Sequence, residues 1–265
     1  MKMLIGGEQV DSASGQTYEV RNPATGEVVD SVPKGNEKDV QQAVQAAEAA
    51  FKEWSDVTAE DRGKMLMNAC ELIKQKSGDI AQALTKEQGK TLFEAGLEIH
   101  HLLHGLEFYA GLASKVRGSH VPLPQKNAYG MVVRQPIGVC AGIVPWNFPL
   151  TLMGTKLGPA LAAGNTIIIK PASTTPLATL IAIDQIQKAT YGEGKGQKTL
   201  PKGAVNVVTG PGGSVGEEIL KNPRIRRIAF TGSTPVGKHV MEVAGREIKR
   251  VTLELGGSDP MIVMD

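Results

Sequence analysis

Short apolar runs alternate with amphipathic segments from Pro136 onward, and this alternation restricts the possible folds more than any other feature. The runs are rich in Val and Ile, whereas the segments between them repeat apolar residues every three to four positions. This order predicts a parallel sheet with right-handed crossovers and helices on both faces. The predicted strands are 137–144, 166–169, 204–208, 226–230 and 250–254, and the predicted helices are 149–163, 176–190, 214–221 and 235–246.

The residues before Pro136 follow other patterns. Apolar and polar side chains alternate over 18–21 and 28–32, on either side of the turn-rich NPATGE, which is typical of a hairpin or of edge strands. The helical period is lost over 118–136, where we expect a loop that enters a β arm. Four helices are expected between these regions: one with Asn36 as its N-cap, one from Thr58, one over 79–88 after Gly78, and one over 91–113.

The composition is that of an ordinary soluble globular protein, with 41% hydrophobic and 21% charged residues in a chain of 265. The 29 Lys and Arg residues barely exceed the 27 Asp and Glu residues, so no global positive field favours nucleic acid as a partner. No apolar run reaches the length of a transmembrane helix, and the N-terminus lacks a signal-peptide pattern. We therefore expect a soluble, cytoplasmic protein that binds neither nucleic acid nor membranes.

Cysteine and histidine do not predict a metal site. Cys70 and Cys140 lie far apart and form no CxxC motif, which suits a reducing compartment rather than a disulfide framework. His100 and His104 are one helical turn apart and could in principle share a metal ion. Because HExxH is absent and no third ligand is evident, a helix face with solvated or hydrogen-bonded histidines is the preferred interpretation.

Polar residues in the stretch 142–176 occur where the predicted strands end. Pro145 stops the first strand, and Asn147 follows in a turn before a helix that starts near Pro149. Lys170 stands at the carboxyl end of the next strand, directly after three isoleucines. Taken locally, Asn147 could be an ordinary turn residue and Lys170 a solvated strand end. In an open α/β sheet, however, ligands bind at the carboxyl ends of the strands.

The motifs PWNFP, GPALAAGNT and IIIKPA, followed in order by FTGSTPVG and LELGG, resemble the aldehyde dehydrogenase superfamily over essentially the whole chain. Several long motifs in one order are far more specific than any single glycine pattern. The expected fold class is α/β, a Rossmann-like parallel sheet preceded by an N-terminal helical segment and a β arm. The expected domains are 1–117 (N-terminal strands and helices), 118–136 (β arm of an oligomerisation sheet), 137–257 (NAD(P)-binding domain) and 258–265 (truncated start of a catalytic domain).

Two glycine-rich turns compete for the pyrophosphate of the cofactor. The turn at 210–216 superficially suggests GxGxxG, but its last glycine is one place late. The turn at 230–237 joins a strand to a helix whose free backbone N–H groups can hold an anion. The resemblance favours the second turn. It implies Gly232, Ser233 and Gly237 at the pyrophosphate, Gly212 and Val236 at the adenine, Lys170 at the ribose, Ile143, Pro145 and Trp146 at the nicotinamide half, and Ala172, Leu255 and Gly256 as further contacts.

Ser173 bears on the choice between NAD and NADP. Many family members that prefer NAD have a glutamate at this place, three residues after the lysine, and its carboxylate would repel a 2′-phosphate. A serine beside Lys170 removes that repulsion, so we expect NADP or NAD, with NADP slightly favoured. Alternatively, Ser173 simply caps the helix that starts near Pro176, and both roles can hold together.

The resemblance implies oxidation of an aldehyde to a carboxylic acid with NAD(P)+ by way of a cysteine thioester. Asn147 corresponds to the amide that stabilises the oxyanion, and Glu254 to the general base. The nucleophilic cysteine of the family belongs a few tens of residues beyond ELGG, and thus beyond Asp265. Neither Cys140, in a predicted strand, nor Cys70, in a predicted helix, corresponds to it, because apolar surroundings do not activate a thiol.

Two functions from different classes follow from the missing cysteine. The preferred one is an NAD(P)-dependent aldehyde dehydrogenase that forms a homodimer or homotetramer in its complete form. The alternative is a truncated, catalytically inactive nucleotide-binding or oligomer-forming module. A related acyl-phosphate reductase ranks third because it should not need Glu254. Thr155 stands where succinate-semialdehyde-oxidising members often have an arginine, which favours small aliphatic or hydroxy-aldehydes over an aldehyde that carries a carboxylate.

Overall fold

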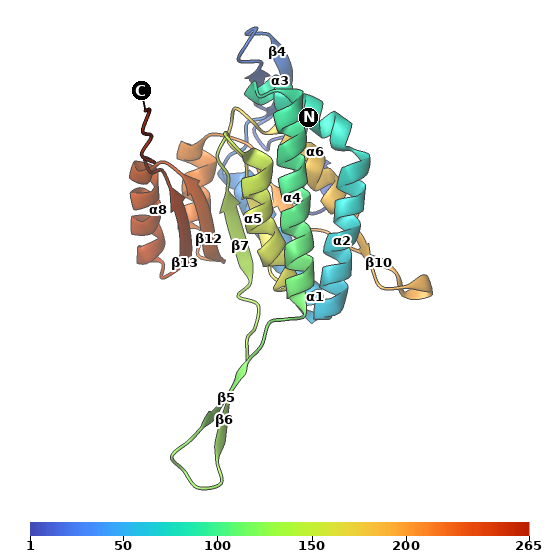
Figure 1. The fold of residues 1–265 in the computed structure, drawn as a ribbon, viewed down its shortest axis with the longest axis vertical. Helices are drawn as coiled ribbons and strands as arrows, with labels where there is room; N and C mark the ends of the chain where they lie inside the picture. Colours follow the sequence, from blue (N-terminus) through green and yellow to red (C-terminus); the bar gives the residue numbers. More distant parts are fainter. Residues whose placement is uncertain (265) are drawn as a thin grey trace.

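A seven-stranded sheet forms the centre of the computed structural model, which describes residues 1–264 (Figure 1). Its strand order is β13-β12-β7-β8-β11-β1-β2, and all the pairings from β13 to β11 are parallel. The predicted parallel sheet is therefore confirmed. The parallel strands are β7 (Val139–Ile143), β8 (Thr166–Lys170), β11 (Val205–Val207), β12 (Ile225–Gly232) and β13 (Arg250–Leu255).

The direction of strand addition reverses beside β7. From β7 the chain adds β8 and β11 on one side and then β12 and β13 on the other, which places a topological switch point between β7 and β12. The register aligns Ile143 of β7 with Lys170 of β8 and with Phe230 of β12. The carboxyl ends of three strands thus meet at one edge of the sheet, where a crevice for ligands forms in folds of this kind.

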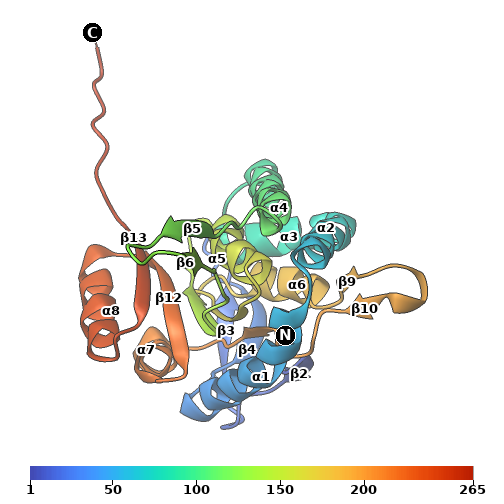
Figure 2. The same cartoon turned by 90° about the horizontal axis from the view of Figure 1, so that it is seen from below.

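Helices cover both faces of the sheet, as the alternation predicts (Figure 2). On one face lie α5 (Pro149–Ala162) and α6 (Leu177–Ile186), with α2 (Ala59–Gln75), α3 (Ser77–Gln88) and α4 (Leu92–Ala113) packed outside them. On the other face lie α1 (Glu37–Asp56), α7 (Glu217–Lys221) and α8 (Thr234–Arg246). Strand β8 divides its side chains accordingly: Ile167 and Ile169 join the first core, and Ile168 joins the second.

The N-terminal helices begin where capping residues predict. Asn36 and Thr91 each form a capping box. The side chain of the cap residue accepts a backbone N–H of the first turn, and the carboxylate three residues later accepts the backbone N–H of the cap residue. Thr58 caps α2 through its hydroxyl. One boundary was wrong: Gly78 lies inside α3, which starts at Ser77, because a glycine within the first turn of a helix costs little.

The second half differs from the expected elements in two places. The helix expected over 176–190 ends at Ile186, and a short hairpin of β9 (Thr190–Tyr191) and β10 (Lys198–Thr199), with the 3₁₀ turn η1 (Gly194–Gly196), replaces its last turn and the following loop. The helix expected over 214–221 opens as a π-helical segment, η2 (Gly212–Gly216), before α7. The glycines at 192, 194 and 196 in the hairpin and at 212, 213 and 216 in the π-helical segment do not favour a regular α-helix. Helix α6 itself ends before the first of them.

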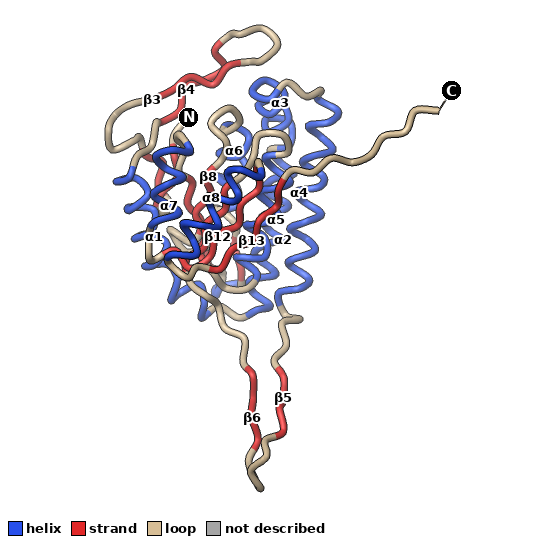
Figure 3. Tube along the Cα trace, turned by 90° about the vertical axis from the view of Figure 1, so that its left-hand side faces the viewer, coloured by secondary structure: helices blue, strands red, loops and turns tan. Residues whose placement is uncertain are grey.

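Three hairpins complete the architecture. The strands β3 (Thr17–Arg21) and β4 (Val28–Pro33) pair as predicted, and β5 (Ser119–Pro122) and β6 (Tyr129–Val132) form the predicted arm, which projects from the body (Figure 3). The hairpin of β1 (Met3–Ile5) and β2 (Glu8–Val10) was not predicted. It extends the central sheet because β1 pairs antiparallel with β11. Within residues 1–264, no helix is long and apolar enough to cross a membrane.

Two glycines let α4 and α5 approach closely. A Cβ atom built on Gly154 would stand 2.7 Å from Cδ1 of Leu102, and one on Gly158 would stand 2.7 Å from Cδ2 of Tyr109. Such distances are below van der Waals contact, so larger residues would push the two helices apart. The turn that contains Asn147 therefore leads directly into a helix that packs tightly against α4.

Candidate functional site

The turn between β7 and α5 presents Asn147 at the switch point. Pro145 ends the strand and Pro149 starts the helix, so Asn147 stands in the short exposed segment between two prolines. Its Oδ1 accepts the backbone N–H of Phe148 at 3.0 Å, which restrains the side chain. Among residues 1–264, no protein group accepts a hydrogen bond from its Nδ2, so that amide is available to a ligand.

Lys170 lies buried at the carboxyl end of β8. Its Nζ donates to the carbonyl of Pro171 at 2.9 Å, and no carboxylate of the described chain forms an ion pair with it. Burial lowers the pKa of Lys170 to about 8 because the charged form loses its hydration. Lys170 is therefore not the solvated strand end that its local sequence allowed.

Ser173 does not cap α6. Its hydroxyl donates to the carbonyl of Gly210 at 3.1 Å, which ties the turn after β8 to the turn after β11. The first N–H groups of α6, from Leu177 and Ala178, donate instead to the buried carboxylate of Glu87 at 2.6 and 2.8 Å. The capping alternative for Ser173 is thus wrong, because a glutamate distant in sequence occupies the helix terminus.

The glycine turn after β12 leads into α8, whose N-terminus has no capping side chain. Ser233 is the N-cap residue, but its side chain makes no capping bond. A Cβ on Gly237 would stand 2.4 Å from Cδ2 of Leu255, and one on Gly232 would stand 2.5 Å from Cζ of Phe230. A larger residue at Gly237 would displace the Leu255 side chain, against which α8 packs on β13, and one at Gly232 would displace the ring of Phe230. Gly212 opens the π-helical segment, and Val236 is half exposed in the first turn of α8.

Glu254 belongs to a network that the sequence did not predict. Thr231 lies opposite Glu254 in the β12–β13 register, and its hydroxyl donates to Oε2 of Glu254 at 3.1 Å. The same hydroxyl accepts from Nζ of Lys156 at 2.6 Å, and Nζ also donates to the carbonyl of Leu152. Burial lowers the pKa of Lys156, whereas the charge of Glu254 acts to raise it. A lysine between the buried Met153 and Leu157 was the signal that could have identified Lys156.

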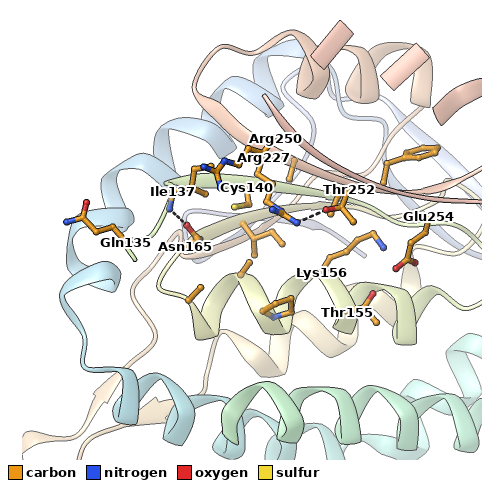
Figure 4. A pocket seen from close by; sticks show the side chains of 17 residues that line it. Gln135, Ile137, Cys140, Thr155, Lys156, Asn165, Arg227, Arg250, Thr252 and Glu254 are labelled. Carbon is orange, nitrogen blue, oxygen red and sulfur yellow. Dashed lines mark hydrogen bonds between the residues drawn. The ribbon is translucent and has the colours of Figure 1, made fainter. Parts of the chain in front are cut away.

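A cavity of about 370 Å³ opens between α5 and the face of β7, β12 and β13 (Figure 4). Thr155 and Lys156 line it from α5, and Thr252 and Glu254 line it from β13. Figure 4 shows Lys156 and Glu254 converging at one end of this hollow, while Arg227 and Arg250 lie toward the other. The cavity gives a small molecule access to the carboxylate of Glu254.

Both thiols are buried away from the carboxyl edge of the sheet. Cys140 lies within β7 in the wall of the cavity, and Cys70 lies on α2, where its Sγ contacts the carbonyl of Leu103. Burial raises the pKa of each thiol to about 12. Each is therefore protonated near neutral pH, which makes it a poor nucleophile. Within residues 1–264, no three His, Cys, Asp or Glu side chains stand close enough together to hold a metal ion.

The sequence-predicted residues gather at one edge because each belongs to the end of a parallel strand or to the turn that follows it. The distribution is as follows: Ile143, Pro145, Trp146 and Asn147 at β7; Lys170, Ala172 and Ser173 at β8; Gly212 after β11; Gly232, Ser233, Val236 and Gly237 at β12 and α8; Glu254, Leu255 and Gly256 at β13.

The switch point, the buried strand-end lysine and the glycine turn before α8 define an open α/β fold of the dinucleotide-binding class. Comparison with known proteins identifies the family within this fold class. The model of the aldehyde dehydrogenase family matches residues 9–265, and the chain belongs to that family.

Curated relatives and solved structures agree with this assignment. The chain is 42% identical to glutarate-semialdehyde dehydrogenase of Pseudomonas putida over 98% of its own length and 52% of the relative. It is 41% identical to an NADP+ succinate-semialdehyde dehydrogenase of Escherichia coli, over 99% of its length and 52% of the relative. The crystal structure of succinate-semialdehyde dehydrogenase from Burkholderia pseudomallei superposes with a TM-score of 0.93 at 42% identity, over 100% of this chain and 53% of that one. The chain thus spans about half the length of the relatives it matches.

Proposed function

We propose that this chain forms the cofactor-binding part of an NAD(P)+-dependent aldehyde dehydrogenase, which oxidises an aldehyde to a carboxylic acid through a cysteine thioester. The observation that carries the proposal is that Asn147, Lys170 and Glu254 lie at the carboxyl ends of β7, β8 and β13, on either side of the switch point, in a chain that belongs to this family. The nucleophilic cysteine is assigned to a segment outside this sequence. The domain divisions at 117, 136 and 257, and a homodimer or homotetramer that uses the β5–β6 arm, belong to the same proposal.

The N-terminus of α8 supports the cofactor assignment. The first N–H groups of α5 and α6 already bind protein carboxylates, from Glu98 and Glu87, whereas α8 has no capping side chain. A pyrophosphate fits the N-terminus of α8, where the helix dipole and the free N–H groups favour an anion. Lys170 would hold the ribose, and Ser173 leaves room for a 2′-phosphate, so NADP is slightly favoured over NAD. The nicotinamide, when bound, accepts the hydride from the reacting carbon.

Three groups of this chain would then act on the substrate. The Nδ2 of Asn147 donates to the oxyanion that forms when a thiolate attacks the aldehyde carbonyl. Glu254 removes a proton from the water that hydrolyses the thioester, so that the hydroxide oxygen bonds to the acyl carbon and the thiolate leaves. Thr231 holds the Glu254 carboxylate by a direct hydrogen bond, and Lys156 fixes the hydroxyl of Thr231 by donating to it.

The buried thiols support an external nucleophile. Cys70 and Cys140 lie in helical and strand interiors with pKa values raised to about 12, and neither adjoins Asn147 in the turn after β7. The alternative function, a nucleotide-binding or oligomer-forming module without turnover, also fits this observation. The mass of the native protein separates the two, since a dehydrogenase requires the additional cysteine-bearing segment.

The substrate remains a prediction, and Thr155 in the cavity wall is the residue on which it rests. We expected small aliphatic or hydroxy-aldehydes, whereas the similar relatives include glutarate- and succinate-semialdehyde dehydrogenases as well as a D-glyceraldehyde dehydrogenase of Picrophilus torridus. A panel of succinate semialdehyde, glyceraldehyde and propanal, compared by kcat/KM in the active enzyme, decides between these classes. A preference for succinate semialdehyde would overturn the expectation drawn from Thr155.

The primary test is calorimetric titration of this 265-residue chain with NADP and with NAD, alongside an assay of aldehyde-dependent NAD(P)H formation. We expect binding without turnover, and a loss of affinity in Lys170→Met. Lys202→Met is the matched control, because Lys202 is exposed and pairs only with the surface residue Glu8. Failure of both cofactors to bind would contradict the proposal. Turnover by the isolated chain would contradict the assignment of the nucleophile to an outside segment.

A further inference from the structure

We propose that Lys90 and Glu98 are positioning residues that fix the Asn147 turn for oxyanion stabilisation. The inference rests on the proposed function, and it assigns these two side chains to the geometry of Asn147 rather than to general stability. Neither residue lies near the site in sequence. Glu98 belongs to α4 and Lys90 to the link between α3 and α4, outside the part of the chain that carries the cofactor motifs.

Lys90 lies in the corner between two helices, near Gln88, whose Nε2 also donates to the Asn147 carbonyl at 3.5 Å. Helix α3 ends at Gly89, whose φ of +91° turns the chain, and α4 begins after its N-cap Thr91. From this corner the Lys90 ammonium donates to the backbone carbonyl of Asn147 at 3.0 Å and forms an ion pair with Glu98. It also lies 4.4 Å from the ring centre of Phe148, which is within cation–π range.

Glu98 holds the other end of the same turn. One oxygen of its carboxylate pairs with Lys90, and the other accepts the N–H groups of Leu150 and Thr151 at 2.7 and 3.3 Å. The Glu98 side chain is fully buried, and that of Lys90 is 9% exposed. Lys90 therefore binds the turn at the carbonyl of Asn147, and Glu98 binds it three and four residues later at the first N–H groups of α5.

This binding restrains a residue that otherwise has few contacts. Asn147 is exposed, and its side chain bonds only to the next backbone N–H within the described chain. An oxyanion donor must lie within a few tenths of an ångström of its productive position, and a displacement of 1 Å can lower the rate about 10²-fold. A charge-assisted clamp on the peptide of Asn147 supplies this precision.

Glu87 provides the matched control. It is a buried carboxyl group from the same helical region that accepts the first two N–H groups of α6, yet within residues 1–264 it makes no hydrogen bond or ion pair with Asn147 or Lys90. A purely structural role for Glu98 predicts that Glu98→Gln and Glu87→Gln have similar consequences. A positioning role predicts that only Glu98→Gln changes the chemical step.

The test is a double-mutant cycle in the active dehydrogenase, which is this chain together with the segment that supplies the nucleophile. We expect Lys90→Met to lower kcat by roughly 10- to 100-fold with KM and NADP affinity nearly unchanged, because the turn shifts while the cofactor site stays intact. In an Asn147→Ala background, Lys90→Met should lower kcat by less than about twofold, because the residue through which it acts is gone. Glu98→Gln should follow Lys90→Met in direction, and Glu87→Gln should leave kcat unchanged.

The opposite results overturn the proposal. An equal loss of kcat from Lys90→Met in both backgrounds, or an equal loss from Glu87→Gln, shows a structural role only. If Lys90→Met fails to fold, Lys90→Gln is used, and hydrogen exchange of the Leu150 and Thr151 amides in the 265-residue chain reports the clamp directly: unchanged protection overturns it. A wild-type enzyme without aldehyde oxidation refutes the proposed function itself, whereas an active wild type with unaffected variants refutes only the role of Lys90 and Glu98.

Discussion

The N-termini of α5 and α6 both have buried N–H groups that need an acceptor, and the two acceptors differ in whether a cation accompanies them. Each helix begins in the protein interior, and each has its first N–H groups bound by a glutamate side chain from the α3–α4 region, Glu98 for α5 and Glu87 for α6. Glu98 is paired with Lys90, whereas no Lys or Arg of residues 1–264 forms an ion pair with Glu87. Buried without a cation, Glu87 has its pKa raised to about 8. The comparison teaches that helix capping alone requires only an acceptor, and that the cation at α5 serves the turn before it.

Helix α8 extends the comparison because its N-terminus has no such carboxylate. The two filled termini belong to helices on one face of the sheet, and the open one follows the glycine turn at Gly232 on the other face. Of the helices α5, α6 and α8, only α8 has first N–H groups that bind no protein carboxyl group within residues 1–264. Glutamates of the N-terminal helices thus bind the first N–H groups of α5 and α6, whereas those of α8 stay available for the cofactor that we assign to it.

The largest effect is expected from Glu98→Leu. The substitution leaves Lys90 buried without its counter-ion and two N–H groups of α5 unpaired, so the free energy of unfolding should fall by about 3–5 kcal/mol. Urea denaturation measures the change, with Glu71→Leu as a control in which only an exposed pair with Lys74 is lost. A loss below about 1 kcal/mol, typical of surface pairs, would contradict the account of the α5 terminus.

The next largest effect is expected in the pH dependence of stability, where Glu87 should contribute through its raised pKa. Its folded pKa of about 8 lies above the ordinary value of 4.5, so between these values the folded chain retains a proton that the unfolded chain releases. The contribution of Glu87 to the free energy of unfolding is fully present below pH 4.5 and is lost as pH rises through about 8. Between pH 5 and 7 the slope approaches about 1.4 kcal/mol per pH unit, or about 2–3 kcal/mol in all. Urea titrations should show this decline in the wild type and not in Glu87→Gln; an equal slope in both assigns it to another group.

Gly237→Ala tests the open terminus of α8. The added Cβ would stand 2.4 Å from Leu255, which forces α8 away from β13 and should destabilise the chain by about 1–3 kcal/mol. NADP binding should weaken as well, because the N–H groups at the start of α8 move with the helix. Gly245→Ala is the matched control, since its Cβ would meet no atom within 4 Å. Calorimetry and thermal melting give both quantities, and full NADP affinity in Gly237→Ala would argue against a pyrophosphate at this turn.

The smallest effect concerns Lys170 and is a change in affinity alone. Its pKa in the free protein is lowered to about 8, so the ammonium is present below that pH and is lost above it. NADP affinity should therefore fall by up to about tenfold between pH 7 and 9.5, since an ammonium bonds the cofactor more strongly than a neutral amine. Isothermal titration at several pH values measures this decline. Lys170→Met should bind more weakly and with little pH dependence in the same range; a wild-type affinity that is flat with pH would separate Lys170 from the cofactor.

Local sequence determined the secondary structure and the edge at which the site lies. The β-branched runs, the capping residues Asn36, Thr58 and Thr91, and the prolines around Asn147 act over a few positions, so their consequences were predictable. Parallel strands bring their carboxyl ends together, and this alone gathered the residues of the motifs. The π-helical start of α7 and the hairpin at 190–199 were missed, because glycine-rich sequence has weak local preferences. The end of α6 at Ile186 was missed as well, and no glycine marks it.

Only the tertiary structure decided which charged side chains became buried partners. Glu87 and Glu98 are separated from the N–H groups they bind by 90 and 52 positions, and in sequence they resemble ordinary glutamates of amphipathic helices. Lys156 likewise meets Thr231 across 75 positions. A carboxylate or ammonium is stable in the interior only when another element supplies its partner, and no local pattern encodes that partner. The sequence thus determined the elements and their order, whereas packing between distant helices and strands decided where the charges of the site are held.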